Sequence, residues 1–403
     1  MRLLIIAPWL PMPDRGSEEL RFSEMLRILA MTHEITLYVW SLWGQNVDEN
    51  DQRRYRAAVE ELGITIRVGY VRQVLKEQSY EIILIEWFHS MDLIGEDIRT
   101  WQSDAKIIVD AVDLEYRRLG IKAEVSHDPI DIAKAGDTRR RELAAYANAD
   151  FIITVSDEER RILARENPNL KLGSLPNIHR FPEKLTPLSD EPVMIFVGDY
   201  RVPPNVDAVQ YFCREVLPLI HRQVPATQLL VVGNAPTDEI RAFASDRITV
   251  TGYVPEVAPY LARSRVSVAP LRYGAGMKGK VGEAMSQGIP VVTTPVGFQG
   301  MEVEADKEVL VADTPTAFAD AVVRLFHDVQ LCNRLRESAW LKMKERFSTE
   351  AARHRLETII TSVSTLPTVK GLSPARRLRR KSVDWLDRHL LWRLKPKGAG
   401  YQA

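Results

Sequence analysis

One stretch of the chain, residues 266–301, limits its possible folds more than any other. An apolar run at 266–270 predicts a strand, and a loop with closely spaced glycines follows it. A helical segment comes next, and a β-branched run at 289–294 then predicts a second strand. The order of strand, glycine-rich loop, helix and strand indicates an α/β protein with a parallel sheet.

The glycine-rich loop has the composition of an anion-binding site. A helix N-terminus preceded by bare backbone offers unpaired N–H groups and the positive end of the helix dipole to phosphate oxygens. Lys278 and Lys280 add positive charge, and Glu283 can accept hydrogen bonds from sugar hydroxyls. We interpret the stretch as a site for a diphosphate and a ribose. The alternative is a tight strand-to-helix turn with solvated lysines, in which Glu283 only complements the helix dipole.

The rest of the chain shows the same alternation of strands and helices in two halves. A length of 403 residues suggests two domains, and the pattern breaks at 178–192, where prolines and mixed charges predict a linker. We predict a first domain at 1–182, a linker at 183–192 and a second domain at 193–345. A helix at 346–364 should return to the first domain, and a basic tail follows at 365–403.

Composition excludes several other classes of protein. Lysine plus arginine equals aspartate plus glutamate, at 54 each, so nothing in the bulk charge favours a nucleic-acid partner, and we expect none. Cys213 and Cys332 lie far apart without a CxxC pair, which fits a reducing compartment and gives no thiol zinc site. The N-terminal apolar run is short and interrupted by proline, unlike a secretory signal, and no run reaches the length of a spanning helix. We therefore expect a cytoplasmic protein.

The segment GAGMKGKVGEAMSQGIPVVTTPVGFQGM, which begins at Gly274, resembles the donor-site signature of the retaining GT-B glycosyltransferases known as "glycosyl transferases group 1". That pattern runs G-x-G-x-K-x-K-x-x-E-A-M, then G-x-P-V-V-x-T and G-x-x-G. The resemblance implies the GT-B fold, with two Rossmann-like parallel-sheet domains facing an interdomain cleft. It also implies transfer of a sugar from a nucleotide-diphosphate sugar to a hydroxyl, with retention of configuration.

The resemblance extends to the individual site residues. The implied donor-binding residues are Gly16, Arg201, Gly274, Gly276, Met277, Lys278, Lys280, Glu283, Gly297 and Gly300. Gly16 belongs to a P-x-x-x-G-G element whose second glycine is here a serine, and Arg201 stands without the lysine that many members carry nearby. The family's earlier acidic residue is replaced by Ala275, so no carboxylate is assigned to the transferred sugar.

The acceptor side resembles the family's D-x-H-[DN]-x-E-x-x-R region. The expected residues there are His89, Asp110, Glu115 and Arg117, and the catalytic candidates are Lys278, Lys280 and Asp113. Val112 stands in place of the family's histidine. His89 can replace it in space or serve as a capping or packing residue. Without an assigned base, front-face transfer is expected, in which the leaving phosphate helps to deprotonate the acceptor.

The implied donors are UDP-, GDP- or dTDP-sugars, and the implied acceptor is a saccharide or a lipid-linked glycan of the cell envelope. Protein cations take the place of a metal ion, so we expect no cofactor. Two other functions remain open, namely a non-enzymatic nucleotide-sugar-binding scaffold and a sugar-nucleotide epimerase of the same fold. A dinucleotide dehydrogenase is disfavoured because the first strand-to-helix turn lacks G-x-G-x-x-G.

The tail differs in composition from the rest of the chain. Residues 370–397 combine clustered arginines with Trp385, Trp392 and several leucines. A basic amphipathic helix with tryptophans is typical of segments that lie on a membrane surface, which suggests peripheral attachment at the inner face of the cell membrane. The alternatives are a helix docked on the body of the protein, a partner-binding segment and a disordered basic tail.

Overall fold

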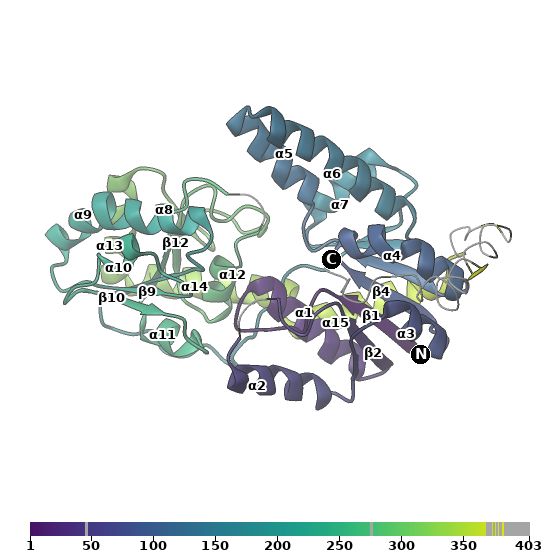
Figure 1. Cartoon of the computed structure of the whole chain (residues 1–403). Helices are drawn as coiled ribbons and strands as arrows, with labels where there is room; N and C mark the ends of the chain where they lie inside the picture. Colours follow the sequence, from purple (N-terminus) through teal and green to yellow (C-terminus); the bar gives the residue numbers. More distant parts are fainter. Residues whose placement is uncertain are drawn as a thin grey trace.

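The computed structural model describes residues 1–44, 47–274 and 277–367, together with positions 373, 375, 378, 381 and 382. The chain forms two lobes, each built around one sheet in which every described strand pair is parallel (Figure 1). Helices cover both faces of each sheet, which is why the strands read as continuous apolar runs. The predicted α/β class with two Rossmann-like domains is confirmed.

The first sheet has seven strands in the order β3-β2-β1-β4-β5-β6-β7. Their bounds are β1 Arg2–Ala7, β2 Glu34–Val39, β3 Thr65–Arg67, β4 Ile82–Glu86, β5 Lys106–Asp110, β6 Phe151–Thr154 and β7 Leu172–Ser174. The central strands are buried almost throughout, whereas the two edge strands are short and partly exposed. The polarity of β7 hid it from the sequence pattern.

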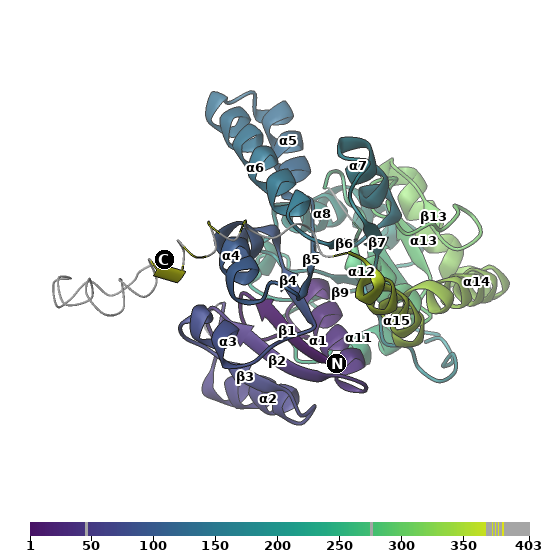
Figure 2. The same cartoon turned by 90° about the vertical axis from the view of Figure 1, so that its right-hand side faces the viewer.

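The helices of the first domain are α1 Ser17–Ala30, α2 Glu49–Glu60, α3 Val71–Glu77, α4 Phe88–Trp101, α5 Glu115–Ser126, α6 Pro129–Ala147 and α7 Asp157–Glu166. Two of them, α5 and α6, pack against each other as a hairpin that projects beyond the sheet (Figure 2). Asp128 caps α6 through a hydrogen bond from the N–H of Ile130, and Pro129 fits the first helical position.

The second sheet has six strands in the order β10-β9-β8-β11-β12-β13. Their bounds are β8 Val193–Val197, β9 Gln228–Val232, β10 Ile248–Gly252, β11 Val266–Ala269, β12 Val291–Thr293 and β13 Leu310–Val311. Strands β11 and β12 pair directly and flank α12, as expected for the stretch at 266–301.

The helices of the second domain are α8 Pro203–Tyr211, α9 Leu217–Gln223, α10 Asp238–Arg241, α11 Ala258–Arg263, α12 Gly279–Ser286, α13 Pro315–His327 and α14 Val329–Phe347. A π-helical turn, Phe212–Val216, joins α8 to α9. Ser348 then ends α14 and caps α15 Thr349–Thr365 through a hydrogen bond from the N–H of Ala351.

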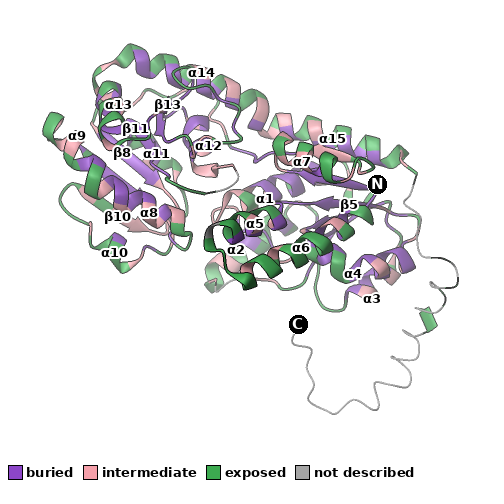
Figure 3. Ribbon diagram, turned by 90° about the horizontal axis from the view of Figure 1, so that it is seen from above, coloured by how far each residue is buried: buried purple, intermediate pink, exposed green. Residues whose placement is uncertain are grey.

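Helix α15 returns from the second lobe to the first (Figure 1). Its buried face joins the apolar core beneath α1 through Ala352, Leu356, Ile359, Ile360 and Val363. In each domain the buried side chains form one cluster on either face of the sheet. Figure 3 marks the buried residues in purple along the ribbon. None of the helices in the described ranges is long and apolar enough to cross a membrane. The tail predicted to contact a membrane, 370–397, lies almost entirely outside the described residues.

Candidate functional site

The glycine-rich stretch lies at the carboxyl edge of the second sheet, where the strand order reverses. Strand order changes direction between β8 and β11. Open parallel sheets bind ligands just beyond this point, because the connections on either side diverge to opposite faces. The loop from Gly198 follows β8, and the segment leading to α12 follows β11. Two residues of that segment, 275 and 276, lie outside the described residues, so the expected role of Gly276 cannot be placed.

Helix α12 begins directly after Lys278 without a side-chain cap. The first backbone N–H groups of a helix have no intrahelical acceptor, so an uncapped start presents donors and a partial positive charge. No acidic side chain lies in the first turn of α12, so none neutralises the positive end of the helix dipole. The start of α12 therefore offers the kind of environment that anions prefer.

Lys280 is held by two groups of the second domain. Its ammonium donates a hydrogen bond to Asn205 Oδ1 and lies 4.9 Å from the centre of the Phe196 ring. Burial lowers the pKa of Lys280 to about 7, and the neighbouring positive charge of Lys278 contributes to the shift. No carboxylate of the described residues forms an ion pair with Lys280. An anion that binds here would therefore interact with a positive charge that the fold already shields from water.

Lys278 lies beside Lys280 at the same helix start. Burial lowers its pKa to about 8. Gly274 lies next to this lysine and has φ +141°, which residues with a side chain rarely adopt, and a Cβ built there would be in van der Waals contact with Lys278 Cε at 3.5 Å. Two neighbouring ammonium groups at the start of one helix, both with pKa values lowered by burial, indicate a site for a dianion or a diphosphate.

Glu283 is on the same face of α12 as Lys280, three residues farther along. Burial raises the pKa of its carboxyl to about 7. Its side chain has no hydrogen bond or ion pair within the parts of the chain that the structure describes. A desolvated carboxylate without a partner can accept two hydroxyl hydrogen bonds, as a ribose would supply.

The other residues predicted to bind the donor near α12 are Gly297, Gly300 and Met277, and their contacts differ. A side chain at Gly297 would collide with Thr293, whose hydroxyl donates to the carbonyl of Ala269 at 2.8 Å. Packing alone therefore accounts for that glycine. Gly300 has φ +77°, which favours glycine, and a Cβ built there would lie 3.9 Å from Met277 Cβ.

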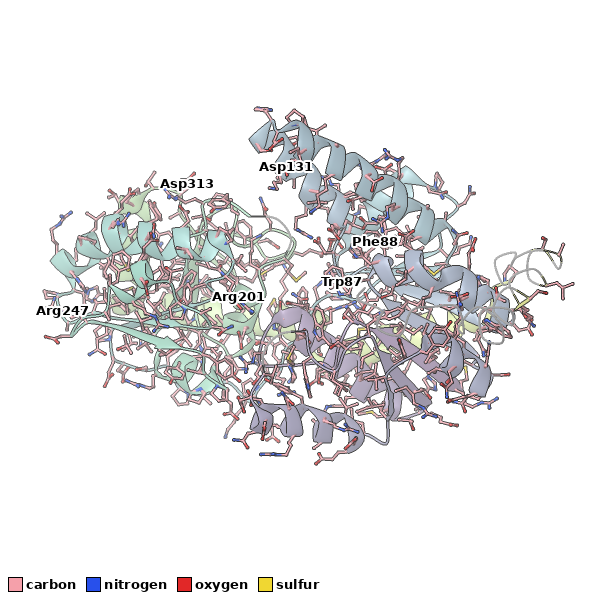
Figure 4. All side chains as sticks on the ribbon, viewed as in Figure 1. Trp87, Phe88, Asp131, Arg201, Arg247 and Asp313 are labelled. Atoms are coloured by element: carbon pink, nitrogen blue, oxygen red, sulfur yellow. The ribbon has the colours of Figure 1, made fainter. Side chains whose placement is uncertain are left out.

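Arg201 is in the expected loop, but its charge is already paired. It is half-exposed and forms a bidentate contact with Asp199 at 2.5–3.1 Å. Figure 4 shows it on the side of the second domain that faces the first. To contact a donor phosphate, the Arg201 guanidinium must break its ion pair with Asp199 or bind both groups at once.

The first domain approaches α12 through the start of α1. Gly16 is the N-cap of α1, and Ser17 is so close to Gly279 that a Cβ built on Gly279 would lie 2.6 Å from the Ser17 hydroxyl. Nearby, the Tyr253 hydroxyl of the second domain donates to Asp14 at 2.5 Å, and Arg15 stacks 3.8 Å above the Tyr253 ring. The candidate donor site is thus at the boundary between the domains.

The residues expected on the acceptor side divide into two groups: Asp110 is bound beneath α1, whereas Arg118 links Glu115 to Asp113 beside His89. Asp110 is fully buried and is held by Arg21 through two hydrogen bonds of 2.7 and 2.9 Å, so each of its oxygens already accepts a hydrogen bond from the fold. Glu115 pairs with His89 at 3.2 Å. Asp113 accepts a hydrogen bond from Arg118 at 2.8 Å, and Arg117 is exposed.

Two features of the site had no signal in the sequence pattern. Asn205 binds Lys280 and also donates to the Asp199 carbonyl at 2.7 Å, so it ties the loop after β8 to α12. The contact of Asp14 and Arg15 with Tyr253 joins residues more than 230 positions apart.

Comparison with known proteins supports a glycosyltransferase-like second domain. Residues 191–328 match the family model "Glycosyl transferases group 1". The chain is 26% identical over 195 residues to "Putative glycosyltransferase YtcC" of Bacillus subtilis (strain 168), covering 44% of this chain and 47% of that protein. It thus spans less than half the length of the curated relatives that it matches.

Solved structures with the same fold cover most of the chain. Sucrose-phosphate synthase from Thermosynechococcus elongatus superposes with a TM-score of 0.66 at 17% identity, covering 90% of this chain and 98% of that one. Anabaena Alr3699/HepE in complex with UDP and glucose gives a TM-score of 0.64 at 13% identity, covering 90% and 99%. These likenesses establish the GT-B fold.

Proposed function

We propose that the protein transfers a sugar from a nucleotide-diphosphate sugar to a hydroxyl group, with retention of configuration. The observation that carries the proposal is the pair of desolvated lysines at the uncapped start of α12, with Glu283 on the same face. The family match covers all three residues, and a protein of the same fold was solved with UDP and glucose.

In the proposed complex, the diphosphate lies against the start of α12 between the two domains. Lys278 and Lys280 face its oxygens, and Glu283 accepts hydrogen bonds from the ribose hydroxyls. Gly16, Gly274, Gly300 and Met277 shape the backbone around it. Arg201 joins the site if it exchanges Asp199 for a phosphate oxygen.

The proposed reaction breaks the bond between the anomeric carbon and the diphosphate oxygen. The acceptor hydroxyl oxygen forms the new bond on the same face, and its proton passes to the leaving phosphate. The two ammonium groups and the helix N-terminus stabilise the negative charge that develops on the diphosphate. This scheme requires no side-chain base. Asp113, which binds Arg118 in this structure, remains a predicted catalytic residue.

We also propose that the lysines make a metal ion unnecessary. They supply the positive charge that Mg²⁺ provides in other phosphate-transfer sites. In the ranges that the structure describes, no group of three or more His, Cys, Asp or Glu side chains could hold a metal ion. Turnover that survives excess EDTA supports this part of the proposal, and turnover that requires added Mg²⁺ contradicts it.

The proposed acceptor is a saccharide or a lipid-linked glycan used in cell-envelope assembly. The proposed location is the cytoplasm, with contact at the inner face of the membrane through 370–397. This part of the proposal comes from the clustered arginines and tryptophans of the tail.

The function is tested by a screen of UDP-, GDP- and dTDP-sugars, with thermal shift for binding and radiolabel transfer for turnover. Bacterial lipid extracts and simple saccharides serve as acceptors. The proposal predicts that at least one donor both stabilises the protein and transfers its sugar. Binding without transfer would favour a scaffold, and an altered sugar formed without any acceptor would favour an epimerase.

A further inference from the structure

The first sheet also has a point at which its strand order reverses, between β1 and β4. The same argument that places a ligand at the carboxyl edge of the second sheet applies here. The loop that follows β1 leads to Gly16 and α1, which contact the second domain at Gly279. Strand β4 ends at this point with Glu86. The function proposed above assigns no role to this residue.

Glu86 points to the face of the sheet that α1 covers. It pairs in register with Asp110 of β5, so the two side chains lie on the same face. Asp110 is bound there by Arg21 of α1. Glu19 of α1, whose charge also acts on Glu86, is occupied by hydrogen bonds from the Trp9 indole at 2.6 Å and the Met12 N–H at 2.9 Å.

Glu86 itself has no partner. Its side chain is 7% exposed, and none of the described residues forms a hydrogen bond or an ion pair with it. Burial raises the pKa of its carboxyl well above the usual range, and the nearby charges of Asp110 and Glu19 add to the shift. A buried carboxyl group without a partner is costly, and an apolar residue of the same size would stabilise the fold more. Its presence at this edge therefore points to a ligand.

The next residue gives an independent sign of a constrained site. Trp87 has φ +67°, which is rare for a large side chain, and its N–H donates to the Asp110 carbonyl at 2.9 Å. In the view of Figure 4, Trp87 lies on the side of the first domain that faces Arg201 of the second. The strained backbone thus turns the end of β4 toward the boundary between the domains.

We propose that Glu86 binds a hydroxyl group of the acceptor saccharide. A carboxyl group can both accept and donate a hydrogen bond, which matches the two roles of a sugar hydroxyl. The acceptor is favoured over the donor because Lys278, Lys280 and Glu283 are all contributed by the second domain. Glu86 makes and breaks no covalent bond in this role. The inference rests on the proposed function.

The test compares the full-length wild type with Glu86→Leu and Glu86→Gln. Each protein is assayed with the nucleotide sugar and the acceptor that the wild type uses in the screen above, and UDP or GDP binding is measured by calorimetry. We expect Glu86→Leu to lower kcat/KM for the acceptor at least tenfold and to change nucleotide affinity less than twofold. Glu86→Gln, which keeps a hydrogen-bonding group, should retain more activity than Glu86→Leu.

Thermal unfolding separates a binding role from a structural one. Glu86→Leu should raise the Tm or leave it unchanged, because it removes a buried carboxyl group without a partner. The matched control is Glu142→Leu, in which the lost carboxylate accepts hydrogen bonds from the Tyr116 N–H at 2.9 Å and the Tyr146 hydroxyl at 2.8 Å. That variant should lower the Tm.

If the wild type transfers a sugar, three outcomes overturn the proposal. Wild-type acceptor kinetics in Glu86→Leu would show that no acceptor hydroxyl depends on this residue. A proportional loss of nucleotide affinity would assign Glu86 to the donor instead. A lower Tm in both Glu86 variants would indicate a structural role. Absence of transfer by the wild type refutes the proposed function itself, and the role of Glu86 in acceptor binding with it.

Discussion

Replacing Lys280 by methionine should make the ligand-free protein more stable and the enzyme much slower. Methionine keeps the length of the side chain and removes the charge. Burial lowers the pKa of Lys280 from 10.5 to about 7. A difference of this size corresponds to at most about 5 kcal/mol of lost stability when the lysine is charged. Because the side chain is partly exposed, a realistic penalty is about half of that.

The penalty depends on pH in a defined direction. The folded state holds the proton of Lys280 less tightly than the unfolded state does. The destabilisation is therefore complete below about pH 7 and disappears as the pH rises toward 10.5, where the unfolded lysine also loses its proton. The variant also leaves Asn205 without its lysine partner, at a cost of about 1 kcal/mol. The net gain near pH 6 is about 1–2 kcal/mol, or a Tm increase of about 2–8 °C.

The loss of the Lys280 charge should also slow the reaction. A preorganised cation that faces developing negative charge contributes about 3 kcal/mol, so kcat should fall about 100- to 1,000-fold. Differential scanning fluorimetry between pH 6 and 10 measures the change in Tm, and steady-state kinetics measures the change in kcat. Lys184→Met, at an exposed linker position, is the matched control and should change neither quantity. A Lys280→Met protein with unchanged kcat, or with a Tm difference that grows as the pH rises, would refute the reasoning.

Other substitutions test further parts of the site. Glu283→Gln should weaken UDP or GDP binding about tenfold in calorimetry, because hydrogen bonds to a charged acceptor contribute about 1.5–3 kcal/mol. Unchanged affinity would show that Glu283 does not bind the ribose. Gly279→Ala should reduce donor affinity because its new Cβ meets Ser17. Combining it with Ser17→Gly should restore much of the lost affinity. If the double variant binds the donor no better than Gly279→Ala, Ser17 and Gly279 are not in contact as described. A chain truncated before 370 should keep its Tm and lose recovery with sedimented liposomes containing anionic lipid, and equal recovery of both forms would disprove membrane contact through the tail.

The fold was accessible from the sequence because its central strands are buried on both faces. Such strands read as unbroken apolar runs, as at residues 3–7 and 82–85. The short edge strand at Leu172–Ser174 lacks that signal and was missed. The projecting hairpin of α5 and α6 was missed as well, because its exposed isoleucines at 121, 130 and 132 interrupt the expected amphipathic pattern.

The candidate site was predictable only where its residues are neighbours in the sequence. Lys278, Lys280 and Glu283 share one helix start, so spacing alone brings them together. The contact between Lys280 and Asn205 depends on how β8 and β11 pair, and no local pattern reports that pairing. Asp110 matched a family motif, yet only the structure shows that Arg21 occupies both of its oxygens.

The central claim is that a diphosphate binds to the two lysines at the start of α12, and proton uptake on binding tests it most directly. With pKa values of about 8 for Lys278 and about 7 for Lys280, both lysines are partly deprotonated at pH 8. A bound diphosphate should raise both pKa values, so binding should draw about one proton from the buffer. Calorimetry of UDP or GDP at pH 8 in buffers of different ionisation enthalpy measures that number. The account predicts uptake of about one proton in the wild type and almost none in Lys278→Met/Lys280→Met, whereas tight binding by the wild type without proton uptake would contradict it.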